Sequence, residues 1–197
     1  MNRNLKIGLL ITGILLFLVA ILLFLTRYTT KAHSPEELTS YEGKDLKMEI
    51  FYNRPYKKGR KIFGALVPYN EVWRTGANEA TTFTTNRDIL VDGSLLPAGK
   101  YTLWTIPMED SWKVIFNSQM YPWGINLEKK AYRDPTFDVL VLERPVNLLK
   151  EELEQFTIYF EESGEFVELR FAWDHTLIKV PILKEKAPES AFNISGE

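Results

Sequence analysis

The chain has 197 residues, which is enough for one folded domain and a short additional segment. Its net charge of −2 argues against a general nucleic-acid-binding protein, because such proteins are strongly basic, so we expect no nucleic-acid partner. The chain has no cysteine and two histidines, which excludes disulfides, thiol nucleophiles and a lipid-modified cysteine and argues against a histidine-rich metal site. We therefore expect no metal ion and no cofactor.

The first element that the sequence predicts is a membrane-spanning helix over residues 7–25. This run is apolar apart from Thr12, and its roughly 19 residues, at about 1.5 Å each, cover the hydrocarbon thickness of a bilayer. Basic residues flank the run on both sides, namely Arg3, Lys6, Arg27 and Lys31. We assign residues 1–28 to a single-pass transmembrane anchor.

A cleaved signal peptide is the alternative interpretation of this segment. Its apolar region would be shorter, about 7–15 residues, and would end in small residues. Here apolar residues continue to Leu25, and Thr30-Lys31-Ala32 is a poor cleavage site. Arg3 and Lys6 favour a cytoplasmic N-terminus, although the positive charge after the run nearly balances them. We place the main domain outside the cytoplasmic membrane, on the periplasmic side.

A polar segment follows, and residues 29–44 are predicted to form a linker. It contains Gly43, and only Pro35 to Leu38 favours one helical turn. From Leu46 to Tyr52 every second residue is apolar, which is the period of a half-buried strand.

Beyond residue 79 the sequence predicts further short strands separated by turns, because β-branched and aromatic runs alternate with Gly, Pro and Asp. These strands are residues 80–87, 89–91, 100–106, 112–117, 137–143, 154–161, 166–173 and 177–183, with Asp174-His175 as the turn between the last two. We therefore expect an all-β domain, an antiparallel β-sandwich over residues 45–183, with a closed barrel as the alternative. Residues 184–197 are predicted to be a disordered polar tail.

The stretch between the first two strands, residues 53–79, is the candidate binding loop. It mixes arginines, aromatic residues and glycines without helix or strand periodicity, and loops of this kind are typical of binding surfaces. Its three arginines are Arg54, Arg60 and Arg74, and guanidinium groups suit phosphate, sulfate or carboxylate ligands. We expect these arginines to approach one anion-binding pocket with Glu79 at its wall. The alternative is a solvated basic loop.

The sharpest motif in this loop is Trp73 to Glu79. Its Gly76 permits a positive φ or a close ligand approach, and Arg74 and Glu79 can act as charge stabiliser and general base. The alternative is a structural ion pair that fixes the turn. With Trp123 from a later loop, the candidate ligand-binding residues are Arg54, Arg60, Arg74, Asn78, Glu79 and Trp123.

Other aromatic residues and the histidines favour structural interpretations. Trp104, Trp112 and Trp173 lie in predicted strands, so we expect them in the core or at its rim. His175 follows an aspartate, but no serine stands in a nucleophile-elbow context, so we interpret it as an exposed turn residue. His33 lies in the predicted linker and receives no function.

Several short motifs carry a resemblance to a known family. They are Arg54-Pro55, Gly59-Arg60, Ile62 to Gly64, Leu66 to Tyr69, Val72 to Glu79, Leu96 to Tyr101, Trp112 to Asn117, Trp123-Gly124 and Trp173. Over roughly residues 44–183 the chain resembles the bacterial domain of unknown function number twenty-nine-eleven. Such proteins carry an export or membrane segment before the domain, often a cleavable signal where this chain looks anchored. The resemblance implies no activity, so the function must come from the residues.

Three hypotheses about function remain. The first is a non-catalytic module at the membrane that binds an anionic small molecule, a glycan or an envelope protein through the arginine-rich site. The second is a hydrolase of an anionic or glycan substrate, which requires a pocket holding Glu79 with a raised pKa. The third is a structural partner of another membrane protein, which requires an exposed apolar patch.

Overall fold

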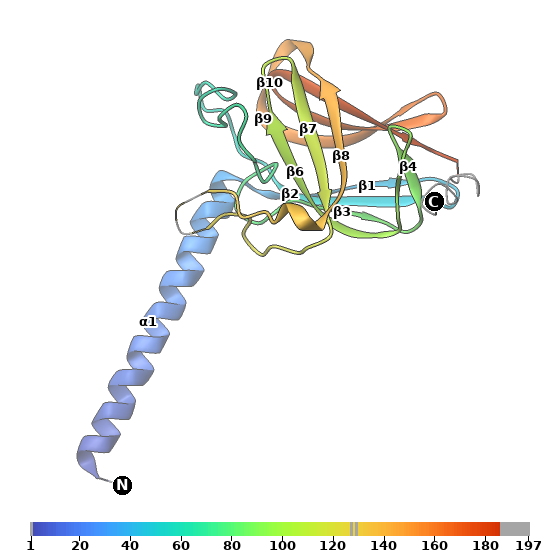
Figure 1. The fold of residues 1–197 in the computed structure, drawn as a ribbon. Coiled ribbons are helices and arrows are strands. Elements are labelled where there is room, and N and C mark those ends of the chain that lie inside the picture. The colour runs from blue at the N-terminus through green and yellow to red at the C-terminus, as the bar shows by residue number, and fades with distance from the viewer. Residues whose placement is uncertain (1, 127, 129, 186–197) are drawn as a thin grey trace.

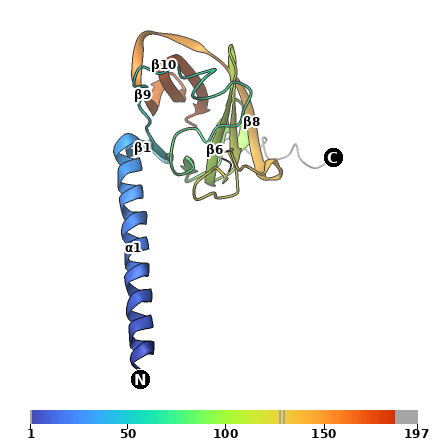
Figure 2. The ribbon, with the colours of Figure 1, turned by 90° about the vertical axis from the view of Figure 1, so that its left-hand side faces the viewer.

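The computed structural model describes residues 2–126, 128 and 130–185 and consists of one long helix and a β domain. Helix α1 (Arg3–His33) projects away from the β domain in both views (Figures 1 and 2). None of its described residues is buried, and it is long and apolar enough to cross a membrane. The predicted N-terminal apolar helix is therefore confirmed, although it continues past residue 28 to His33.

The β domain contains two open antiparallel sheets. The larger has the strand order β1-β2-β3-β6-β7-β8, and the smaller has the order β5-β4-β10-β9. The elements are β1 (Glu36–Glu42), β2 (Lys47–Asn53), β3 (Thr82–Thr85), β4 (Ile89–Val91), β5 (Ser94–Leu96), β6 (Gly99–Pro107), β7 (Ser111–Asn117), the 3-10 turn η1 (Pro135–Phe137), β8 (Asp138–Pro145), β9 (Asn147–Ser163) and β10 (Phe166–Leu183). Neither sheet closes on itself, so the sandwich is confirmed and the barrel alternative is wrong.

The main core lies between the two sheets, and strand β2 shows how the sequence builds it. Met48, Ile50 and Tyr52 are fully buried on one face of this strand, as its period of two predicts. Trp112 of β7 and Trp173 of β10 belong to the same cluster. Both tryptophans are therefore core residues, as expected.

A second, smaller cluster lies around Trp104 of β6. Trp104 is fully buried and packs with Ile115 of β7 and with Tyr121, whose ring meets it edge-on at 5.3 Å. Because side chains alternate along a strand, Trp104 lies on the face of β6 opposite to its core neighbour Leu103. Through Tyr121 and Ala131, this cluster fixes the segment after β7 (the described residues of 118–137) onto the outer face of the six-stranded sheet.

The linker predicted at residues 29–44 is wrong in this structure. Glu36–Glu42 forms β1, which pairs with β2 from Glu36↔Asn53 to Glu42↔Lys47. The sequence does not predict this strand because β1 lies at the edge of the sheet and has no buried residue, so it lacks an alternating apolar pattern. Its Leu38 is 61% exposed. Backbone pairing with β2 holds it in place, and Tyr41 is the residue of β1 that packs, partly buried, against the main core.

The turn predicted at Asp174-His175 is also wrong. β10 runs through these residues as one strand, and its register with β9 shifts on either side of Asp174, which has a φ of 55°. The sequence predicts a turn here because aspartate is common at positive φ, and positive φ occurs both in turns and in β-bulges. The polar tail predicted at residues 184–197 lies outside the described residues from residue 186 onward.

The candidate binding loop joins β2 to β3 as a long irregular segment, residues 54–81. Figure 1 shows its first part, in teal, protruding above the end of α1. Two isolated bridges tie the loop to the sheets, Tyr56↔Gln155 to β9 and Trp73↔Thr105 to β6. The loop therefore rests on both sheets and has a defined path.

Candidate functional site

A cleft of about 1000 Å³ lies where the 54–81 loop, the segment after β7 and the end of α1 meet. Its volume is at the upper end of the range typical of ligand pockets. The lining residues are His33, Ser34, Pro55, Lys58, Arg60, Leu66, Val67, Pro68, Glu71, Val72, Trp73, Arg74, Gly76, Ala77, Ile125, Lys130, Ala131 and Trp173. Together with Trp173 of β10, these segments, which are far apart in the chain, build one concave surface.

Aromatic packing makes one wall of the cleft rigid. The rings of Trp73 and Trp173 stack with centroids 6.1 Å apart and an interplanar angle of 19°. Phe63 meets both rings edge-on from the core. The indole N–H of Trp73 donates to the carbonyl of Gly76 at 3.0 Å, and its backbone N–H donates to the carbonyl of Thr105 at 2.7 Å. Trp73 therefore presents a fixed apolar surface to a ligand.

Arg74 lies beside this wall and is held by the segment after β7. Its Nη1 donates to the carbonyl oxygen of Trp123 at 2.9 Å. Burial lowers the pKa of Arg74, and the nearby charge of Glu79 acts in the opposite direction. A guanidinium group keeps its proton at any physiological pH, so Arg74 is a partly desolvated cation next to the cleft.

The balance of charge in the cleft is positive. Four of its lining residues are cationic, Lys58, Arg60, Arg74 and Lys130, against one carboxylate, Glu71. Arg60 donates to the carbonyl oxygens of Lys57 and Tyr56 within its own loop, and these bonds fix it without neutralising its charge. Over the described part of the chain, the Lys58 ammonium forms no ion pair. An anionic group would therefore be attracted into the cleft.

The turn at Thr75 and Gly76 decides which residues of the Trp73–Glu79 motif reach the cleft. Thr75 is buried and has a φ of 56°, which is rare for a β-branched residue. Gly76 has a φ of 153°, and a Cβ there would lie 2.9 Å from the carbonyl of Asn53. Arg74, before the turn, lines the cleft, whereas Glu79, after it, does not.

Glu79 instead joins the β domain to the end of α1. Its carboxylate lies 3.2 Å from Nη2 of Arg27 and 3.2 Å from Nζ of Lys31, and it accepts a hydrogen bond from Nδ2 of Asn53 at 3.0 Å. Burial alone would raise the pKa of Glu79, but its own backbone N–H, Lys31 and Asn53 outweigh burial and lower it. A carboxylate of lowered pKa is a weak base, and Glu79 does not line the cleft, so neither its pKa nor its position favours a general base there.

Asn78 belongs to the same junction. It is buried with a φ of 54°, and its Nδ2 donates to the carbonyl of Ser34 and to Oδ1 of Asn53, both at 3.3 Å. Asn78 also borders a second, smaller hollow of about 270 Å³. Its contacts therefore fix Ser34, the residue that caps the end of α1.

Arg54 and Trp123 lie elsewhere. Arg54 pairs with Glu37 of β1 and donates to the carbonyl of Phe156 and to Oγ1 of Thr157 in β9, so it ties the two sheets together. Trp123 is 39% exposed and does not line the cleft. Its backbone carbonyl accepts the hydrogen bond from Arg74. Of the three arginines expected in one pocket, Arg60 and Arg74 line the cleft and Arg54 does not. Glu79, which was expected at the wall of this pocket, does not line the cleft either.

Sequence reasoning missed several residues that line the cleft. Lys58 was in the candidate loop, but nothing local distinguished it from a solvated lysine. Trp173 was expected in the core or at its rim, and nothing in the sequence linked it to the cleft. Lys130 and His33 are remote in the chain, and only the three-dimensional path of the segment after β7 and of α1 brings them to the cleft.

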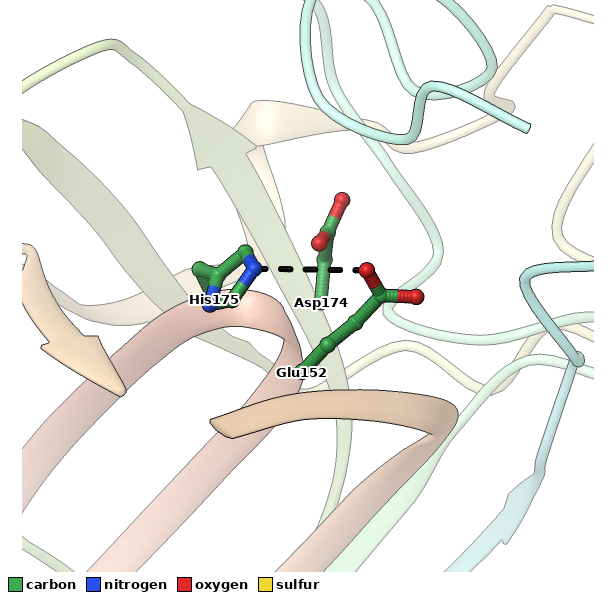
Figure 3. Close-up of side chains that lie close together, drawn as sticks. All are labelled: Glu152, Asp174 and His175. Atoms are coloured by element: carbon green, nitrogen blue, oxygen red, sulfur yellow. Dashed lines mark ion pairs between the residues drawn. The ribbon is translucent and has the colours of Figure 1, made fainter. Parts of the chain in front are cut away.

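A cluster with metal-ligand chemistry lies at the β10 bulge (Figure 3). Ligand atoms of Glu152, Asp174 and His175 lie within 4.8 Å of one another. The ammonium of Lys57 lies 2.8 Å from Asp174 and 3.0 Å from Glu152, and its hydrogen bond to Asp174 raises the pKa of this lysine. Because a cation already stands between the two carboxylates, the cluster is an ion-pair network that anchors the loop to β9 and β10.

The profile described as "Protein of unknown function (DUF2911)" matches residues 34–182, which is more than half of the chain. The chain belongs to this family. The DUF2911 match begins at residue 34 and so includes β1, which the predicted domain boundary had left out. Searches of curated proteins and of solved structures found no match.

Proposed function

We propose that this DUF2911 domain is a non-catalytic binding module, held at a membrane by α1, whose cleft binds an anionic ligand. One observation carries the proposal, namely that four cationic side chains and one carboxylate line a cleft with an aromatic wall. Arg60 and Arg74 are held by carbonyl oxygens, which leaves their charge available to a ligand. Fixed guanidinium groups bind phosphate, sulfate or carboxylate with little loss of side-chain entropy.

The junction at Glu79 supports a retained helix. Arg27 and Lys31 of α1 are both within ion-pair distance of this carboxylate, and His33 lines the cleft. Cleavage near Ala32 would remove both cations and leave Glu79 to Asn53 alone. We therefore propose that α1 is an anchor, with the β domain on the extracytoplasmic side as Arg3 and Lys6 favour.

The hydrolase hypothesis loses its candidate base in this structure. It requires a carboxylate of raised pKa in the cleft, but Glu79 lies outside the cleft lining and its pKa is lowered. Glu71 is the carboxylate that does line the cleft, and it is exposed. The binding function is better supported because it requires charge and shape without a poised base.

The structural-partner hypothesis keeps one supporting observation. Phe137, at the end of η1, and Val139 and Val141 of edge strand β8 are between 42% and 51% exposed. Edge strands with exposed apolar side chains are prone to pair with other chains. An added partner along β8 is compatible with a ligand in the cleft.

Ligand-observed fluorine NMR tests the proposed binding function. The full chain in nanodiscs of neutral phosphatidylcholine is mixed with para-trifluoromethylbenzenesulfonate, a soluble apolar anion. We expect its resonance to broaden saturably, whereas the matching neutral benzyl alcohol does not broaden. Lys58→Gln should weaken the sulfonate affinity by about threefold, because an exposed ion pair contributes up to about 1 kcal/mol. Lys113→Gln is the matched control, because Lys113 is exposed on β7 and does not line the cleft.

Equal broadening of the sulfonate and the alcohol would contradict an anion site. Equal weakening by Lys58→Gln and Lys113→Gln would show only the effect of net charge, and the cleft would lose its role.

A further inference from the structure

The cleft adjoins the second hollow at the point where α1 meets the β domain. The second hollow is lined by Thr29, Thr30, His33, Ser34 and Asn78, and it shares His33 and Ser34 with the cleft. Thr29 and Thr30 lie one helical turn closer to the apolar run than His33 does. The two hollows therefore lie next to each other, and the second hollow is the one nearer to the apolar run of α1.

If α1 spans a membrane, the position of the second hollow along this helix places it near the membrane surface. The apolar run ends at Leu25, and four to five residues at about 1.5 Å each put Thr29 and Thr30 roughly 6–8 Å beyond it. The headgroup region on each side of the hydrocarbon is about 5–8 Å thick. In an anchored protein, the second hollow thus opens at the outer edge of the headgroups.

The lining of the cleft suits a molecule that is apolar at one end and anionic at the other. Trp73 forms an apolar wall that is backed by Trp173, which is 2% exposed, and Leu66, Val67 and Val72 extend this wall. The cations described above are also part of the lining. A small inorganic anion would leave the apolar wall uncovered, and an uncharged lipid would leave the cations without a partner.

We infer that the ligand is a single-chain anionic amphiphile that enters from the bilayer. This inference rests on the proposed binding function and names the class and the source of the ligand. The charged head leads past His33 and Ser34 to Lys58, Arg60 and Arg74, and the chain covers Trp73 and the apolar residues beside it. A two-chain lipid is disfavoured because its second chain would have to leave the hydrocarbon.

Tryptophan quenching by a nitroxide-labelled amphiphile tests this inference directly. All five tryptophans lie at or after residue 73, so α1 itself contributes no emission. The full chain is placed in phosphatidylcholine nanodiscs that contain a single-chain alkyl phosphate with a nitroxide at its chain end. We expect saturable quenching, and we expect little quenching by the alcohol of the same chain or by nitroxide-labelled phosphatidylcholine.

Two helix variants test the route. Thr30→Phe places a ring in the second hollow and should weaken quenching by the alkyl phosphate at least threefold while leaving sulfonate binding in the cleft unchanged. Thr26→Phe is the matched control, because Thr26 is exposed, lies one turn earlier and also bonds to a backbone carbonyl of its own helix. It should leave both readouts unchanged.

The outcomes separate this inference from the proposed function. Sulfonate binding without selective quenching by the alkyl phosphate overturns the inference and leaves the binding function in place. Equal quenching by the alkyl phosphate and the alcohol, or no effect of Thr30→Phe, also overturns it. Absence of both sulfonate binding and quenching overturns the binding function as well.

Discussion

The ammonium of Lys31, in the last turns of α1, lies 3.2 Å from Oε1 of Glu79 in the β domain. The same carboxylate oxygen lies 3.2 Å from Nη2 of Arg27, and the other oxygen accepts from Asn53. One side chain thus connects the helix to strand β2 and to the turn that presents Arg74. This junction sets the position of the cleft relative to α1.

Replacing Glu79 by Gln should loosen the junction and leave ligand binding nearly intact. The ion pairs with Arg27 and Lys31 would be lost, and we expect amide hydrogen exchange at residues 29–34 to become faster, by about fivefold for a loss of about 1 kcal/mol. Sulfonate affinity should stay within about twofold, because Glu79 does not line the cleft. Loss of sulfonate binding in this variant would contradict the separation of junction and cleft.

The junction should also weaken at acid pH. Because the folded-state pKa of Glu79 lies below its unfolded value of about 4.3, its contribution to stability is present above the unfolded pKa and is lost as pH falls through the folded pKa. Hydrogen exchange at residues 29–34, corrected for intrinsic rates, should therefore accelerate below about pH 4. In Glu79→Gln this acceleration should be smaller, and an identical pH profile in both proteins would contradict the assignment.

Gly124→Ala should displace Arg74. Gly124 has a φ of 76°, and an added Cβ would lie 3.2 Å from Cβ and 3.3 Å from Cδ of Arg74. We expect a loss of stability of about 1–2 kcal/mol from the positive φ and, in addition, weaker sulfonate binding. The control is Gly93→Ala, since Gly93 has a φ of 79° with no atom within 4 Å of the added Cβ. It should lose stability without losing affinity.

Tyr52→Phe should destabilise the sandwich without a direct effect on the cleft. The hydroxyl of Tyr52 in β2 accepts from the N–H of Ile158 in β9 at 2.9 Å and donates to its carbonyl at 3.2 Å. Burial raises the pKa of Tyr52 to about 12, against the smaller opposing effect of the Ile158 backbone. Leaving these buried groups unpaired should cost about 1–3 kcal/mol in urea unfolding. Tyr132→Phe, at an exposed ring, should cost little.

The sequence predicted the fold better than it predicted the site. Alternation in β2 and the apolar run of α1 are local patterns, and both lead to the correct element. β1 was missed because it is an edge strand held by backbone pairing, which leaves no strong apolar pattern. The bulge at Asp174 was taken for a turn because both use positive φ.

The candidate site shows why closeness in sequence is a poor guide to closeness in space. Arg74 and Glu79 are near neighbours in the chain, but positive φ at Thr75, Gly76 and Asn78 sends them to different surfaces. Lys130, by contrast, joins the cleft from a segment that no pattern linked to it. Arg54 was predicted to bind a ligand because its neighbours in the sequence do not tell whether an arginine binds an anion or joins two sheets. In the structure it joins the two sheets.

The most direct test of the central claim is to observe the indole N–H resonances of the nitrogen-labelled full chain during titration with para-trifluoromethylbenzenesulfonate. Trp73 and Trp173 line the cleft, whereas Trp104 and Trp112 do not. Assignment by single Trp→Phe variants identifies each signal. The account predicts saturable shifts of the Trp73 and Trp173 signals, with those of Trp104 and Trp112 unchanged. Shifts confined to the exposed Trp123, or no shift at saturating sulfonate, would contradict an anion-binding cleft.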